Sequence, residues 1–128
     1  MKVPIETIRL SQKARDQLSQ LKRKTGIENW NVLCRWAFCM SISEDSEPAP
    51  AEIPSDSSVE MNWKTFGGEF EQVYRVLFYQ RSATSGSSGS EYFRLHLHRG
   101  IGYLQNALTN DKKDGLIAMF RITEGLTL

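Results

Sequence analysis

The stretch SQKARDQLSQLKRKTG, residues 11–26, decides the fold of the N-terminal half because it carries both ends of an α-helix. Ser11 is a residue type that caps helix N-termini, since its hydroxyl accepts a hydrogen bond from an early backbone N–H. Gly26 suits the left-handed position that follows a helix. Between them, apolar residues recur at i, i+4 and i+7, the spacing of one helix face, at Ala14, Leu18 and Leu21. The stretch therefore predicts an amphipathic helix over 11–24.

Helical spacing continues through most of the remaining chain. It predicts a second helix over 29–40, with Trp30 packing at its start. A third is expected over 69–80, and its inward face would consist of Phe70, Val73, Tyr74 and Leu77. The fourth, over 91–108, has the strongest pattern, at Phe93, Leu97, Ile101, Leu104 and Leu108. Asn110 or Asp111 would cap a short last helix around 116–120.

Residues 5–10 precede these helices and alternate imperfectly between apolar and polar side chains. This pattern predicts a short strand or extended arm with Ile8 and Leu10 on one side. An extended segment followed by two helices is the element order of a ribbon-helix-helix protein. The sequence therefore predicts a mainly α, small helical domain with a short N-terminal extended arm and a ribbon-helix-helix-like N-terminal half.

Length and composition limit the class of protein. The chain has 128 residues, close to the commonest domain size, which predicts one domain over 1–128. Hydrophobic residues make up 40% and charged residues 24%, as in ordinary globular proteins. No apolar run approaches the roughly 18 residues of a membrane span. Because residues 1–6 also lack the apolar core of a secretion signal, we expect a soluble, cytoplasmic protein with no membrane partner.

Charge is unevenly distributed, although the net charge is only +1. Residues 1–40 hold eight basic and three acidic side chains, a balance of +5. Residues 41–60 hold six acidic side chains and no basic one, a balance of −6. This acidic stretch contains three of the four prolines and little apolar surface to bury, which predicts a flexible linker over about 43–60.

A second low-complexity stretch, SATSGSSGS over 82–90, is composed almost entirely of small residues. Glycine and serine in such proportions are typical of flexible loops. The stretch predicts a loop, and its composition fits an engineered substitute for a natural loop as well as a natural one.

The residue types that carry most enzyme chemistry do not converge in this sequence. His96 and His98 would lie about 200° apart on a helix, which prevents them from chelating one ion together. Cys34 and Cys39 have neither zinc-site nor redox-motif spacing, and we interpret them as reduced, buried apolar residues. The glycines of RGIG, 99–102, are better explained by close helix packing or local backbone freedom than by dinucleotide binding. We therefore expect no catalytic activity, no metal and no cofactor.

Polar residues of the helix over 11–24 form two rows beside its apolar face when the helix is projected at about 100° per residue. One row contains Lys13, Gln17, Gln20 and Lys24, and the other contains Arg15, Ser19 and Lys22. Long basic side chains in such rows can lie along the protein while their charged ends reach phosphates. The alternative is an ordinary solvated helix surface. The rows predict a candidate surface for the DNA backbone.

Several segments together are similar to those of a known family. They are residues 9–11, 20–27 and 31–38, followed by WKTFGG at 63–68 and LHLHRGIGYL at 95–104. In this combination the chain resembles the DndE family over nearly its whole length, apart from the acidic and Gly/Ser stretches. That family belongs to the bacterial DNA phosphorothioation system, in which sulfur replaces a non-bridging phosphate oxygen.

The resemblance implies an accessory, nucleoid-associated protein of DNA sulfur modification, with sulfur delivered by other members of the system. It implies a homotetramer that binds duplex DNA, preferably nicked, through a lysine-rich surface, with other DNA sulfur modification proteins as partners. The DNA-binding positions that it suggests in this sequence are Lys13, Lys22, Arg23 and Lys24, with Arg15, Gln17 and Arg9 as weaker candidates.

Three alternatives remain open at this point. A ribbon-helix-helix transcriptional regulator would present Thr7 and Arg9 to base edges from a strand paired between two copies. A structural scaffold subunit would dock onto the modification enzymes and touch DNA only incidentally. The acidic stretch would be a solubilising linker, or it would lie over the basic helix and compete with DNA.

Overall fold

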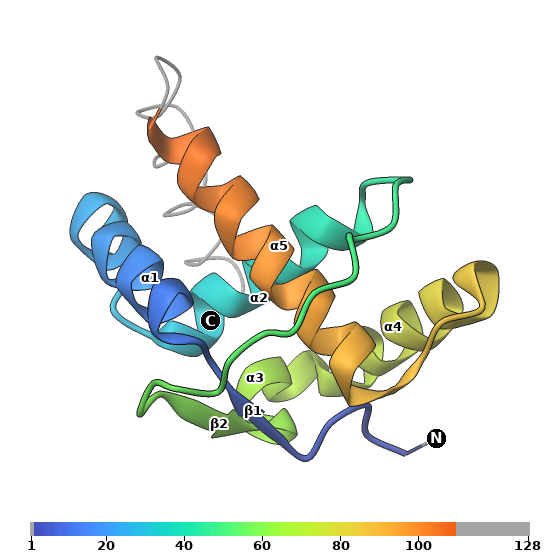
Figure 1. Ribbon diagram of the computed structural model, residues 1–128. Helices are drawn as coiled ribbons and strands as arrows, with labels where there is room; N and C mark the ends of the chain where they lie inside the picture. Colours follow the sequence, from blue (N-terminus) through green and yellow to red (C-terminus); the bar gives the residue numbers. More distant parts are fainter. Residues whose placement is uncertain (1, 110–128) are drawn as a thin grey trace.

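The computed structural model describes residues 2–109 as a mainly α domain with a small two-stranded sheet (Figure 1). This agrees with the predicted fold class. The predicted short helix around 116–120 lies outside the described residues. In chain order the elements are β1 (Thr7–Arg9), α1 (Gln12–Thr25), α2 (Trp30–Ile42), β2 (Glu60–Asn62), α3 (Trp63–Gly67), a 3-10 turn (Gly68–Phe70), α4 (Glu71–Ser85) and α5 (Gly89–Thr109).

The long helix α5 organises the core, running between α1 and α4 in the view of Figure 1. The five apolar positions predicted for its inward face are all buried, which confirms its pattern. It packs most extensively against α2. At the crossing, a Cβ added to Gly100 would lie 1.7 Å from the carbonyl oxygen of Ala37. Close helix packing therefore explains Gly100, because no larger residue fits there.

Helix α1 has the predicted caps and the predicted inward face. The Ser11 hydroxyl accepts a hydrogen bond from the Ala14 N–H at 3.1 Å. Gly26 adopts a left-handed conformation, with φ of 75°, and its N–H donates to the Lys22 carbonyl oxygen. The buried side chains are Ala14, Leu18, Leu21 and Thr25. The two polar rows of the helix are thereby left outside the core.

The predicted extended arm is a strand, and its partner lies in the same chain. β1 pairs antiparallel with β2, with Ile8 opposite Met61. Ile8 and Leu10 are both fully buried, as their alternation predicts. A ribbon-helix-helix dimer instead pairs this first strand with the same strand of a second copy. The element order matches that class, whereas the observed strand pairing does not.

The third predicted helix differs from the structure in its bounds and its inward face. The region folds as α3, a 3-10 turn and then α4, with Gly68 at φ of 60° between them. Phe70 and Val73 were predicted to be inward but are 47% and 52% exposed, and Phe78 is fully buried instead. Apolar residues occur all around this helix, so periodicity alone did not determine which of them faces the core.

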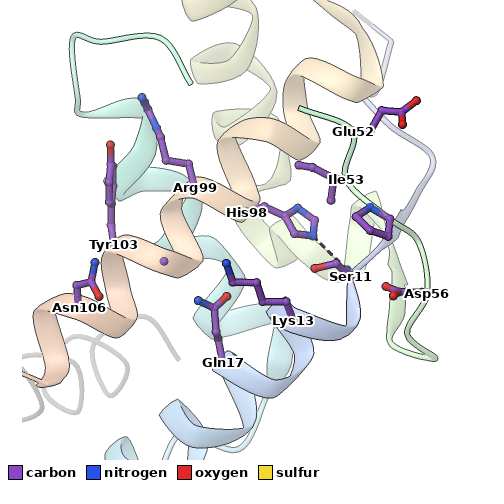
Figure 2. Close-up of a pocket in the computed structure, with 12 residues that line it drawn as sticks. Ser11, Lys13, Gln17, Glu52, Ile53, Asp56, His98, Arg99, Tyr103 and Asn106 are labelled. Carbon is purple, nitrogen blue, oxygen red and sulfur yellow. Dashed lines mark hydrogen bonds between the residues drawn. The ribbon is translucent and has the colours of Figure 1, made fainter. Parts of the chain in front are cut away.

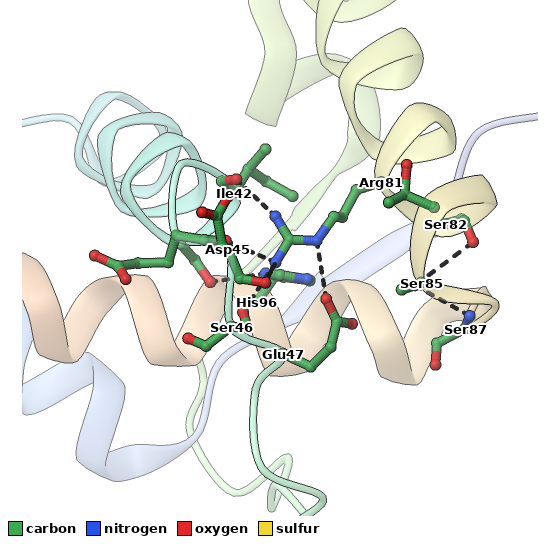
Figure 3. Close-up of polar contacts among 12 residues, drawn as sticks. Ile42, Asp45, Ser46, Glu47, Arg81, Ser82, Ser85, Ser87 and His96 are labelled. Atoms are coloured by element: carbon green, nitrogen blue, oxygen red, sulfur yellow. Dashed lines mark hydrogen bonds and ion pairs between the residues drawn. The ribbon is translucent and has the colours of Figure 1, made fainter.

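The acidic stretch predicted as a flexible linker is an ordered strap, the name used below for residues 43–59. It has almost no regular secondary structure, but guanidinium groups of α4 and α5 bind its main chain and that of the last residues of α2 just before it. Figure 3 shows the guanidinium from α4, that of Arg81. Arg81 donates to the carbonyl oxygens of Ile42, Glu44 and Ser46 at 2.7, 2.7 and 2.9 Å. Arg99 donates to those of Ser41 and Ser46 at 2.8 and 3.0 Å, and Arg94 to those of Ile53 and Pro54 at 2.8 and 3.0 Å. The composition of the strap did not predict that it is held in place, because the arginines that bind it come from helices distant in sequence.

The predicted Gly/Ser loop over 82–90 is mostly helical. α4 continues to Ser85, and Gly86 ends it in a left-handed conformation with φ of 77°. α5 begins at Gly89, which leaves only residues 86–88 to connect the two helices. No helix within residues 2–109 is long and apolar enough to cross a membrane.

Candidate nucleic-acid interface

The outward side of α1 carries most of the candidate DNA-binding residues. Lys13, Arg23 and Lys24 are exposed, whereas Arg15, Gln17 and Lys22 are partly buried. Asp16 is the single acidic residue in the helix sequence, and Arg15 lies 3.7 Å from its carboxylate. Charge on this side of the helix is therefore strongly positive.

The row of Lys13, Gln17, Gln20 and Lys24 lies next to α5. Gln17 donates through its amide nitrogen to the Gln105 side chain at 2.8 Å. Gln105 in turn donates to the Gln20 side-chain oxygen at 3.0 Å. The middle of this row is thus engaged in the α1–α5 contact, and its two lysines remain at opposite ends of α1.

The last turn of α1 concentrates three cations: Lys22, Arg23 and Lys24. Lys22 Nζ lies 4.2 Å from the centre of the Trp30 ring, a cation–π contact that orients this lysine. Positive side chains also complement the negative end of the helix dipole. The turn therefore offers a compact basic cluster, called the basic turn below, with an aromatic side chain beside it.

Arg9 occupies a different environment from the other candidates. Its guanidinium forms an ion pair with Glu60 at 2.5 Å and donates to the Ser57 carbonyl oxygen at 3.0 Å. Both partners belong to segments next to its own strand. Arg9 therefore ties β1 to β2, and its charge is offset locally by a carboxylate.

A cleft between α1, α5 and the strap is the feature that sequence reasoning missed (Figure 2). Its volume is about 520 Å³. Lys13 and Gln17 line it from α1, and Gly102, Tyr103 and Asn106 line it from α5. The sequence signal for this cleft was Gly102, because it stands in the middle of a predicted helix and takes no part in the apolar stripe of that helix.

Both histidines have structural roles. His98 accepts a hydrogen bond at Nε2 from the Ser11 N–H at 3.2 Å and donates from Nδ1 to the Arg94 carbonyl oxygen at 2.9 Å. This pattern requires a neutral ring, and burial lowers its pKa. His96 is fully buried and bonded to the Ser41 hydroxyl at 2.7 Å. Burial and the nearby Arg81 and Arg99 cations lower its pKa to about 4.

The cysteines differ from each other, which corrects one prediction. Cys34 is buried, and burial raises the pKa of its thiol to about 12. Cys39, also interpreted as buried, is exposed on α2. Within residues 2–109, no group of three or more histidine, cysteine, aspartate or glutamate side chains could hold a metal ion.

Three strap-region carboxylates have partners away from the basic turn. Asp56 accepts the Gln12 N–H at 2.8 Å, at the opposite end of α1. Glu47 binds Arg81 and the Tyr92 hydroxyl, and the latter contact helps to lower the pKa of Glu47. Glu60 is engaged by Arg9. Competition with DNA by the acidic stretch stays a hypothesis, and these contacts give it no support.

Together, the fold and this surface define a class: a small, mainly α domain with a short ribbon and an outward-facing basic helix. Comparison with known families then identifies the chain. The family model described as DNA sulphur modification protein DndE matches residues 7–112, and the chain belongs to the DndE family.

Solved structures of DndE share the fold. The crystal structure of DndE from Escherichia coli B7A, involved in DNA phosphorothioation modification, is similar with a TM-score of 0.67 and 23% identity; the match covers 80% of this chain and 99% of that one. A glycine-to-lysine mutant of DndE is similar with a TM-score of 0.60 and 23% identity, over 80% of this chain and 98% of that chain. A comparison with curated proteins found no match.

Proposed function

We propose that this protein is an accessory subunit of DNA phosphorothioation that binds the backbone of duplex DNA through the basic turn of α1. Other members of the system would perform the chemistry, and this chain would contribute DNA binding at the nucleoid. His96 and Cys34 are buried, and His98 is bonded to main-chain groups at both ring nitrogens, which supports a role without catalysis.

The observation that carries the proposal is the composition and exposure of the basic turn. Lys22, Arg23 and Lys24 are consecutive, and the last two are exposed. Because Lys22 is held over Trp30, part of its conformational freedom is already lost before a phosphate binds. Lys13, at the other end of the same helix, adds a further cation that a DNA strand running along α1 would pass.

Such a surface recognises phosphates and carries little information about base sequence. Each neutralised phosphate releases counterions, so the logarithm of affinity falls with the logarithm of salt by about 0.9 per phosphate contact. We therefore expect steeply salt-dependent binding with little preference among sequences. A preference for nicked duplex would follow if DNA bends on the protein, because bending an intact site costs on the order of 1–6 kcal/mol.

A homotetramer would multiply these weak contacts through avidity. The exposed side of α4 supports self-association, since Phe70, Val73 and Val76 are 47%, 52% and 47% exposed. An apolar helix surface of this kind suits a second copy of the same chain. The substitution Val73→Glu should then lower the mass measured by light scattering and weaken DNA binding at the same time.

The decisive experiment measures DNA affinity against salt for nicked, intact and single-stranded DNA of one length. Lys22→Glu with Lys24→Glu should weaken binding to all duplexes. If both lysines contact phosphates, the salt slope should fall by about 1.8, from two contacts of about 0.9 each. Lys64→Glu is the matched control, because it removes an exposed lysine on α3. An unchanged affinity and slope in the double variant would refute the role of the basic turn, and equal affinity for nicked and intact duplex would refute the nick preference.

A scaffold subunit is the second candidate, and the apolar side of α4 is the observation that favours it. In that case the α4 surface would dock onto another DNA sulfur modification protein. Val73→Glu and charge reversal of Lys13, Lys22 and Lys24 together separate the two functions. Loss of complex assembly in Val73→Glu with DNA binding retained would support the scaffold, whereas loss of DNA binding in the charge-reversed variant with assembly retained would support the main proposal.

A further inference from the structure

The cleft between α1, α5 and the strap is adjacent to the proposed DNA-binding helix but distinct from its basic turn (Figure 2). Its volume of about 520 Å³ lies in the range of small-ligand sites. We propose that the cleft binds one unstacked nucleotide, either displaced from the DNA that α1 holds or free in solution. The first source rests on the proposed function, and the second does not.

Gly102 is the feature that points to a ligand. A glycine inside a helix lowers helix stability relative to alanine, so its presence in α5 needs a reason. Packing within residues 2–109 supplies none, because a Cβ added to Gly102 would meet none of their heavy atoms within 4 Å. Its φ is also outside the left-handed region, so backbone conformation does not require glycine. The effect of Gly102 is to leave the surface of α5 bare along the cleft, where a flat ring can lie close to the backbone.

The neighbour of this bare surface is an aromatic ring. Tyr103 lines the cleft, and the Arg99 guanidinium lies 5.4 Å from the centre of its ring. Arg99 is itself fixed by its bonds to Ser41 and Ser46, so the ring has a rigid neighbour. Aromatic and guanidinium planes are the groups on which proteins stack unpaired bases. Together they make one wall of the cleft suitable for a nucleobase.

The α1 and strap sides of the cleft carry groups that match the rest of a nucleotide. Gln17 keeps its amide nitrogen bonded to Gln105, and its side-chain oxygen can accept a hydrogen bond from the polar edge of a base. Lys13 supplies a cation for the phosphate from the side of α1. Glu52 and Asp56 lie on the strap side, where carboxylates repel phosphate but accept hydrogen bonds from base amino groups. This charge distribution favours a phosphate near Lys13 and a base toward α5 and the strap.

The test compares a duplex carrying a one-nucleotide bulge with the same duplex in which the bulged nucleotide is abasic. Backbone charge is the same in both, so only the base differs. Wild type should bind the base-containing bulge about fivefold more tightly or better, as expected for one base stacked on an aromatic side chain. A parallel NMR titration with dAMP should give saturable shifts at Tyr103 and Asn106.

Two variants at Gly102 form the matched pair. Gly102→Leu fills the cleft and should abolish both the preference and the dAMP shifts, while affinity for intact duplex stays the same. Gly102→Ala leaves the cleft open and should behave as wild type. Circular dichroism checks that each variant folds, and Gly102→Gln replaces the leucine variant if that one does not.

The outcomes distinguish this proposal from the proposed function. Saturable dAMP binding without any duplex binding would refute DNA binding by α1 and identify free nucleotide as the ligand. A preference for the base-containing bulge without dAMP binding would identify displaced DNA bases. Equal affinity for the two bulges together with no saturable dAMP shifts would overturn the proposal. A preference that survives in the folded leucine or glutamine variant would also overturn it.

Discussion

Gly100 and Gly102 lie two residues apart on α5, and alanine at each should have opposite effects on stability. At Gly100 the new Cβ would lie 1.7 Å from the Ala37 carbonyl oxygen, whereas real Cβ contacts are essentially never shorter than 3.0 Å. The obstacle is backbone and cannot rotate away, so α2 and α5 must separate by about 1.3 Å, the difference between these distances. Replacing glycine by alanine in a helix adds about 1 kcal/mol to the unfolding free energy, whereas overpacking lowers it by about 1–3 kcal/mol or more.

In Gly100→Ala the new Cβ would clash with the backbone of α2, at the most extensive helix–helix contact among residues 2–109. We therefore expect the upper end of the overpacking range to apply. Gly100→Ala should lose about 2 kcal/mol of unfolding free energy net, and Gly102→Ala should gain up to about 1 kcal/mol. Urea denaturation followed by circular dichroism measures both variants. The net loss should lower Tm by several degrees, on the order of 5–10 °C. If Gly100→Ala is as stable as Gly102→Ala, the packing explanation of Gly100 is wrong.

Three further predictions concern the strap, a histidine and the cysteines. Arg81→Ala should release the strap and accelerate its cleavage by a glutamate-specific protease, whereas Arg75→Ala, on the same helix, should not. The pKa of His96 is lowered from 6.5 to about 4, so the unfolded state protonates first as pH falls. Unfolding free energy should therefore decline by about 3 kcal/mol between pH 7 and pH 4 in urea titrations, and His96→Gln should reduce that decline. Iodoacetamide should add one label to the native protein, at Cys39, and a second, at Cys34, only after denaturation, as mass spectrometry can measure.

Local signals determined the parts of the fold that were predicted correctly. The ends of α1 depend on Ser11 and Gly26, which act on neighbouring backbone, and the inward face of α5 follows from one unambiguous stripe. α4 was predicted less well, because its apolar residues surround the helix and the 3-10 turn before it sets the orientation. The partner of β1 lies some fifty residues away in sequence, and no local pattern specifies it.

The candidate site shows the same division between local and distant information. Helical projection places Lys13, Gln17, Gln20 and Lys24 in one row, but only the structure shows Gln105 closing the middle of that row. Arg9 was a candidate because it is basic and precedes α1, but its ion pair with Glu60 holds its side chain against the two-stranded sheet. The cleft could not be predicted, since it forms where α1, α5 and the strap meet.

The way in which the strap is anchored has a consequence for how this protein can diverge. Arg81, Arg94 and Arg99 bind mainly carbonyl oxygens of the strap, a group that every amino acid possesses. We therefore expect selection on the strap's side chains to be relaxed at most positions and the three anchoring arginines to be constrained. Among relatives, we expect the strap to keep the same backbone path while its sequence varies. An alignment would then show little conservation in a segment whose position in the fold is nevertheless fixed.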